Sequence, residues 1–226
     1  MPAEFMPERY SFTLAVIAFL SAVIFGFGLL SLARMLNLKN EIIGELSYVG
    51  GLLIAGGTLL NAIGKLLSAA NGSEPAWLKN SLLFLSAPGF VCLAWALWRA
   101  NRKDSKEVTA GAIWLLPLFI NGGLLALTVA TKMVKGGQVW LKLLLTVITV
   151  ASIIAFVQLA LSALKSKQQF IAILFILSLG MSLAMVLRGN DGTQAAEWAQ
   201  QISRTIAQTI FAIAAVKLWR LSNDKK

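Results

Sequence analysis

The 226-residue chain is 58% hydrophobic and only 13% charged, with a formal net charge of +10. Soluble domains carry about 25% charged residues, so this composition excludes a soluble globular protein and predicts an integral membrane protein in contact with the lipid bilayer. The basic residues lie mainly at the ends of apolar segments, which is a membrane pattern and does not indicate nucleic-acid binding. Because the chain has no histidine and a single cysteine, we expect no metal, no cofactor and no disulfide framework.

Seven apolar segments are each long enough to cross a hydrocarbon core of about 30 Å. We therefore predict an all-α bundle of seven transmembrane helices in a single polytopic domain that covers residues 1–226. The predicted spans are residues 10–36, 42–68, 77–100, 108–131, 138–164, 170–187 and 195–221. Lysine and arginine are more frequent in the links after the first, third and fifth spans and at the carboxyl terminus. This bias predicts an outside amino terminus and a cytoplasmic carboxyl terminus, and we expect a bacterial inner (plasma) membrane.

The second predicted span carries its small residues on one seam. Gly50, Gly57 and Gly64 follow helical spacing with Ser47 and Asn61, while leucines occupy the other side. Small residues allow helices in a membrane to approach closely, so these three glycines are predicted to pack against neighbouring helices. A second interpretation of the same seam is the wall of a solute path, which Asn61 and Lys65 at its outer end would line.

The fourth and seventh spans hold further polar residues within apolar surroundings. Asn121 lies at the centre of the fourth span, in the segment LPLFINGG. In the seventh span, Glu197, Gln201, Arg204 and Gln208 are spaced by four, three and four residues, and so form one stripe. Charged groups inside a bilayer are costly and usually face the bundle interior or water. The stripe predicts a polar face, either toward a cavity or at a wet outer helix end where Glu197 pairs with Arg204 or Lys65.

The ends of the third and seventh spans are similar. FVCLAWALWR at residues 90–99 and FAIAAVKLWR at residues 211–220 share Phe, Ala, Leu, Trp and Arg at an offset of 121. The pattern suggests a parallel repeat of three helices, a linker helix and three helices, an arrangement known in small transporters. Unrelated spans also end in Trp-Arg, because the membrane interface selects both residues.

These patterns favour a small-solute transporter or channel with a polar cavity in the outer half of the bundle. We expect Asn61, Lys65, Asn121, Arg204 and Gln208 to bind the solute, and the positive charges favour an anionic or zwitterionic one. The alternative is a non-catalytic membrane subunit or scaffold, which packs through its glycine faces against a partner membrane protein or a second copy of itself. We expect no enzymatic activity, because the chain has no phosphate-binding loop and no aspartate pair within a span.

Overall fold

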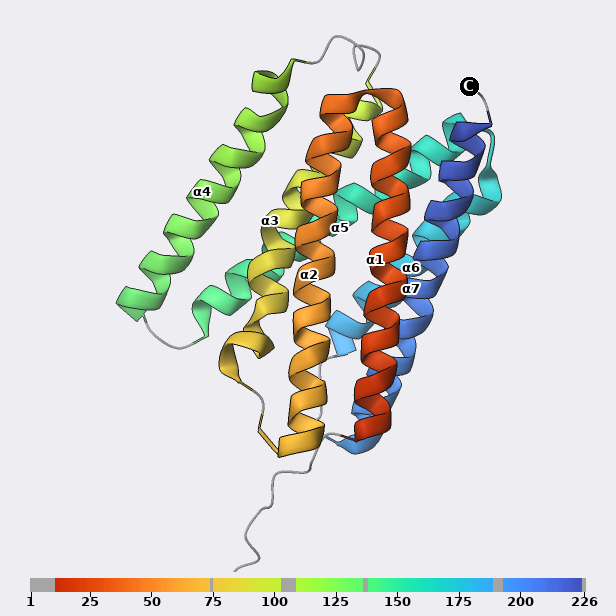
Figure 1. Cartoon of the computed structure of the whole chain (residues 1–226). Helices are drawn as coiled ribbons and strands as arrows, with labels where there is room; N and C mark the ends of the chain where they lie inside the picture. The colour runs from red at the N-terminus through yellow and green to blue at the C-terminus, as the bar shows by residue number, and fades with distance from the viewer. Residues whose placement is uncertain (1–10, 74, 103–108, 136–137, 189–192, 225–226) are drawn as a thin grey trace, which may run out of the picture.

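The computed structural model describes residues 11–73, 75–102, 109–135, 138–188 and 193–224. Within these residues the chain folds into seven α-helices joined by short links (Figure 1). They are α1 (Phe12–Lys39), α2 (Glu41–Asn71), α3 (Ala76–Ala100), α4 (Ala110–Lys135), α5 (Val139–Lys165), α6 (Gln169–Arg188) and α7 (Gln194–Asn223). Every helix end lies within about four residues of the bound predicted from hydropathy, the usual scatter for such boundaries.

Six of the seven helices, α1 to α6, are long and apolar enough to cross a membrane, so the chain is an integral membrane protein. The seventh helix is as long as the others, with 30 residues. It is less apolar because Glu197, Gln201, Arg204 and Gln208 lie along it. By length and apolarity the described residues therefore contain six candidate spans, and α7 is not one of them.

The helices form a ring of six with one helix outside it. Going round the ring, α1 packs against α2, α2 against α3, α3 against α5, α5 against α6, α6 against α7, and α7 against α1. Helix α4 lies beside the ring, where it packs mainly against α3 and α5 (Figure 1). We call the end of the bundle at which α1, α3, α5 and α7 begin the amino end, and the opposite end the carboxyl end.

Glycines allow α2 to approach both of its neighbours closely. A Cβ atom at Gly50 would lie 2.8 Å from the carbonyl oxygen of Gly89 in α3, and one at Gly57 would lie 3.1 Å from Cβ of Leu85. On the adjacent seam, a Cβ atom at Gly51 would lie 3.6 Å from Cβ of Leu29 in α1. Gly50, Gly57 and Gly64 are all buried. The small-residue front of α2 is thus covered within the bundle by α3 and α1.

The carboxyl half of the ring is filled by one continuous apolar core. At its centre the ring of Phe211 lies 5.1 Å from that of Phe25, 5.4 Å from that of Phe156 and 5.9 Å from that of Phe175, measured between centroids. These four residues, which we call the phenylalanine cluster, come from α7, α1, α5 and α6. Tilted and edge-on aromatic pairs of this kind add stability beyond the area that they bury.

Asn40 forms the whole connection between α1 and α2. Its Oδ1 accepts hydrogen bonds from the backbone N–H groups of Ile42 at 2.9 Å and Ile43 at 3.2 Å, and so caps the amino terminus of α2. We expect Asn40→Ala to lower the free energy of unfolding by about 1 kcal/mol, the usual cost of losing such a cap. Unfolding followed by circular dichroism in detergent measures the change. Asn71→Ala, at the exposed far end of α2, is the matched control, and an equal loss in both variants would contradict the capping role.

Candidate functional site

A cavity of about 810 Å³ lies in the amino half of the ring. All six ring helices line it, whereas no described residue of α4 does. Lys65 near the end of α2, Lys79 in the first turn of α3 and Glu197 in the first turn of α7 place it toward the amino end. Toward the carboxyl end it stops at Phe25 and Phe156, two members of the phenylalanine cluster. Its size is within the range of small-molecule sites, about 300–1,000 Å³.

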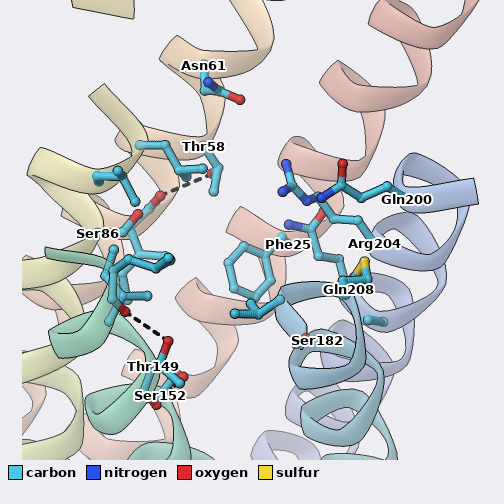
Figure 2. Close-up of a pocket in the computed structure, with 18 of the residues that line it drawn as sticks. Phe25, Thr58, Asn61, Ser86, Thr149, Ser152, Ser182, Gln200, Arg204 and Gln208 are labelled. Carbon is cyan, nitrogen blue, oxygen red and sulfur yellow. Dashed lines mark hydrogen bonds between the residues drawn. The ribbon is translucent and has the colours of Figure 1, made fainter. Parts of the chain in front are cut away.

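One wall of the cavity is polar and is formed mainly by α2 and α7, with the first turn of α3. Lys65 Nζ donates a hydrogen bond of 3.5 Å to Gln201 Oε1, which links α2 to α7. Asn61 Nδ2 donates to the carbonyl oxygen of Lys79 at 3.2 Å, which links α2 to α3. Arg204 lies one helical turn beyond Gln201 on the same face of α7 and also lines the cavity (Figure 2). Three cations, Lys65, Lys79 and Arg204, and one carboxylate, Glu197, give this wall a positive balance.

Hydroxyl groups line the cavity closer to the middle of the bundle (Figure 2). Thr58 donates its proton to the carbonyl oxygen of Ala55 at 2.8 Å, Thr149 to that of Leu145 at 2.8 Å, and Ser182 to that of Ser178 at 2.8 Å. Such bonds to the helix's own backbone are common for Ser and Thr in membrane helices. Each hydroxyl oxygen keeps lone pairs that can accept a hydrogen bond from water or from a solute.

Two buried polar atoms at the cavity have no hydrogen-bond partner among the described residues. They are Ser86 Oγ on α3 and Gln208 Oε1 on α7, and both residues line the cavity. The side chain of Ser86 is only 2% exposed. A buried polar group without a partner costs about 1–3 kcal/mol, so such groups usually mark a place that water or a ligand occupies.

The structure brings four of the five predicted solute-binding residues together. Asn61 and Lys65 on α2, and Arg204 and Gln208 on α7, line the same cavity. Asn121 does not line it, because α4 lies outside the ring. Its Nδ2 atom instead donates to the carbonyl oxygen of Pro88 at 3.5 Å and to Sγ of Cys92 at 3.6 Å, both on α3.

Several cavity residues were not singled out as binding residues by the sequence. Ser86, Thr58 and Lys79 are examples. A single Ser or Thr in an apolar helix carries no signal, because its hydroxyl can be satisfied by the helix itself. Lys79 follows a turn and resembles an ordinary interface lysine. Gln201 belonged to the polar stripe, and at 3% exposure it is the most buried member of that stripe.

The described part of the chain contains no group of three or more Cys, Asp and Glu residues that could hold a metal ion. Comparison with protein-family models, with curated proteins and with solved structures gives no match to this chain. What the cavity does must therefore be argued from its own residues.

Proposed function

We propose that this protein is a small-solute membrane transporter or channel whose cavity takes an anionic or zwitterionic solute. The observation that carries the proposal is that Asn61, Lys65, Arg204 and Gln208 line a single cavity. They come from α2 and α7, near opposite ends of the chain, and six helices surround the space that they share. Packing between helices needs no such cavity, whereas solute binding requires one.

The charges at the cavity support the choice of solute. Lys65, Lys79 and Arg204 outnumber Glu197 on its lining. Electrostatic attraction is several times stronger near a partly desolvated protein surface than in bulk water, so this positive balance favours a negatively charged group. The hydroxyl oxygens of Thr58 and Ser182, whose protons are already donated to the backbone, can accept from a donor group on the solute.

We further propose that α7 is the seventh span and that the amino end faces outside the cell. The polar face of α7 lines the cavity, so in a bilayer its charged residues would lie against a water-filled space rather than lipid. The excess of lysine and arginine at the carboxyl end supports a cytoplasmic location for that end. In this orientation the cavity lies in the outer half of a bacterial inner membrane, and the phenylalanine cluster closes the inner half.

The order of helices in the ring supports the proposed repeat. The pairs α1–α2, α2–α3 and α3–α5 correspond to α5–α6, α6–α7 and α7–α1 if the first three helices match the last three. The linker helix α4 stands outside both halves. In transporters built from two repeats the solute binds between them, which is where this cavity lies.

Uptake by proteoliposomes tests the proposal. The purified chain is reconstituted and supplied with radiolabelled acetate, inorganic phosphate or glycine, which represent two kinds of anion and a zwitterion. We expect uptake of at least one probe above that of protein-free liposomes. Arg204→Gln should lower that uptake about 10- to 100-fold, because a hydrogen bond to a charged group contributes about 1.5–3 kcal/mol.

Arg220→Gln is the matched control, because Arg220 is exposed at the carboxyl end of the same helix and does not line the cavity. Its uptake should equal that of the native protein. Uptake of none of the three probes, or an equal loss in both variants, would contradict the proposal.

The scaffold is the second candidate function, and one observation favours it. A Cβ atom at Gly122 or Gly123 of α4 would have nothing within 4 Å, so these glycines are not used for packing within the described part of the bundle. A partner helix could approach α4 there. In that case Gly123→Leu would abolish association with the partner, while Arg204→Gln would have no effect.

A further inference from the structure

We infer that the solute is an amphipathic anion, whose acidic group lies near Lys65 and Arg204 and whose hydrocarbon chain lies between the amino-end halves of α5 and α6. This inference rests on the proposed function, since it specifies the solute of the same cavity. It follows from the separation of α5 and α6 and from the kind of side chain that each presents there.

Helices α5 and α6 share buried core residues toward the carboxyl end. There Ala155 and Leu159 of α5 share a core cluster with Ile171 and Phe175 of α6. Toward the amino end, Trp140 of α5 and its neighbour Leu144 belong instead to a cluster with Ala87 of α3 and Leu124 of α4. In Figure 1, α5 accordingly crosses the bundle obliquely and its first turns lie away from α6.

Helix α6 is held on the other side of the resulting space. Ser178 Oγ donates a hydrogen bond of 2.8 Å to the carbonyl oxygen of Ala207, which attaches this part of α6 to α7. Because this part of α5 packs on α3 and α4 while α6 is attached to α7, the cavity extends between α5 and α6. Both line it there, through the residues Leu141, Leu145, Ile148, Leu179, Leu183 and Val186.

This side of the cavity is mainly apolar, although the hydroxyl groups of Thr149 and Ser182 also line it, and it reaches the surface of the bundle. Leu145 is 41% exposed and Val186 is 49% exposed, although both line the cavity. Both helices are long and apolar enough to cross a membrane, so in a bilayer the surface that these residues share would face hydrocarbon. A strongly hydrophilic solute would leave this wall without a favourable partner, whereas an alkyl chain would pack against it.

The polar wall lies across the same cavity. Lys65 lines the cavity from α2. Arg204 lines it from α7, and Gln208 follows one turn deeper on the same helix (Figure 2). One cavity therefore offers cations on one wall and branched apolar side chains on another. That combination fits a molecule with a carboxylate or phosphate at one end and an alkyl chain at the other, as in a fatty acid or an acidic lipid.

A chain-length series tests the inference. The full chain in phosphatidylcholine nanodiscs is titrated calorimetrically with acetate, butanoate, hexanoate and octanoate, and empty nanodiscs are subtracted. We expect the dissociation constant to fall by two- to fourfold for each added methylene group, with about fourfold as the limit for complete burial. Arg204→Gln should weaken binding of all four acids about tenfold or more, because they share the acidic group.

Leu183→Trp, which fills the apolar side, should weaken octanoate binding about tenfold and leave acetate binding unchanged. Leu187→Trp is the control, because Leu187 is 86% exposed on the same helix and does not line the cavity. The titrations with acids of increasing chain length use the native protein. They therefore test the inference even if Leu183→Trp fails to fold.

The outcomes separate this inference from the proposed function. Acid binding that requires Arg204 but does not depend on chain length would overturn the inference and leave the anion site in place. Binding of none of the acids would overturn both. Repeating the octanoate titration in phosphatidylglycerol nanodiscs at about 1 M salt, which screens the charge of the bilayer, distinguishes two sources of the same chemistry. A bilayer lipid as occupant would compete and weaken octanoate binding relative to phosphatidylcholine at the same salt, whereas a free acid as occupant leaves it unchanged.

Discussion

Replacing Gly50 by alanine is expected to lower the free energy of unfolding by about 3 kcal/mol, near the upper end of the cost of overpacking a core. The added Cβ atom would lie 2.8 Å from the carbonyl oxygen of Gly89 and 3.0 Å from the backbone nitrogen of Leu93. Both are backbone atoms, so no change of rotamer can make room, and α2 and α3 would have to move apart. Unfolding of the detergent-solubilised protein, followed by circular dichroism, measures the loss.

Two other glycines of α2 provide a graded control. A Cβ atom at Gly56 would have nothing within 4 Å, so Gly56→Ala should be neutral or stabilise the helix by up to about 1 kcal/mol. At Gly57 the nearest atom would be Cβ of Leu85 at 3.1 Å, and Gly57→Ala should give an intermediate loss. Equal stability of the Gly50 and Gly56 variants would show that close α2–α3 packing does not stabilise the bundle.

The helices themselves could be predicted well, because membrane spans follow simple physical rules. A run of about 20 apolar residues between polar links must form a helix in lipid, since its backbone groups have no other partners there. Helix α7 differs from the other six, because it is as long as a membrane span but is not as apolar as one. Its polar stripe was visible at helical spacing, and the structure puts Gln201, Arg204 and Gln208 on the cavity lining.

The candidate site was only partly predictable, because depth along a helix does not specify direction around it. Counting residues along the predicted spans places Asn121, Thr149 and Ser182 near the middle of the bilayer. Thr149 and Ser182 line the cavity, whereas Asn121 contacts α3 from outside the ring. Which helices become neighbours depends on packing between segments distant in sequence, and the sequence of one helix does not contain that information.

The separation of α5 and α6 illustrates the same limit. Nothing in the residues of α5 predicts that its first turns pack on α3 and α4 rather than on α6, because leucines and valines face every side of it. Helix α5 has no narrow hydrophobic stripe that would favour packing against one particular helix. Its neighbours are therefore set by tertiary contacts with the rest of the chain. The apolar side of the cavity is therefore visible only in the folded chain.

The phenylalanine cluster connects the stability of the bundle to the closure of the cavity. Phe25 and Phe156 line the end of the cavity, and both rings pack against Phe211, which is 1% exposed. Phe175 completes the cluster from α6. Phe211 does not line the cavity itself but packs directly behind these two rings, where four of the six ring helices meet.

We expect Phe211→Ala to lower the free energy of unfolding by about 3–5 kcal/mol, the range found when a large buried aromatic residue is truncated. The variant should also allow solute to pass through the bundle, because the space left by the ring would extend the cavity toward the carboxyl end. Efflux of trapped radiolabelled acetate from proteoliposomes should then exceed that of the native protein several-fold, while Phe211→Leu, which keeps most of the apolar volume, should restore both stability and closure.

Phe119→Ala is the matched control, since Phe119 is 80% exposed on α4, the helix outside the ring. Its stability and acetate retention should equal those of the native protein. A Phe211→Ala protein that is destabilised but retains acetate would show that the cluster holds the helices together without sealing the cavity. A variant as stable as the native chain would contradict the role of Phe211 in the core, because a side chain in ring contact with three others cannot be removed without loss unless the helices close the gap.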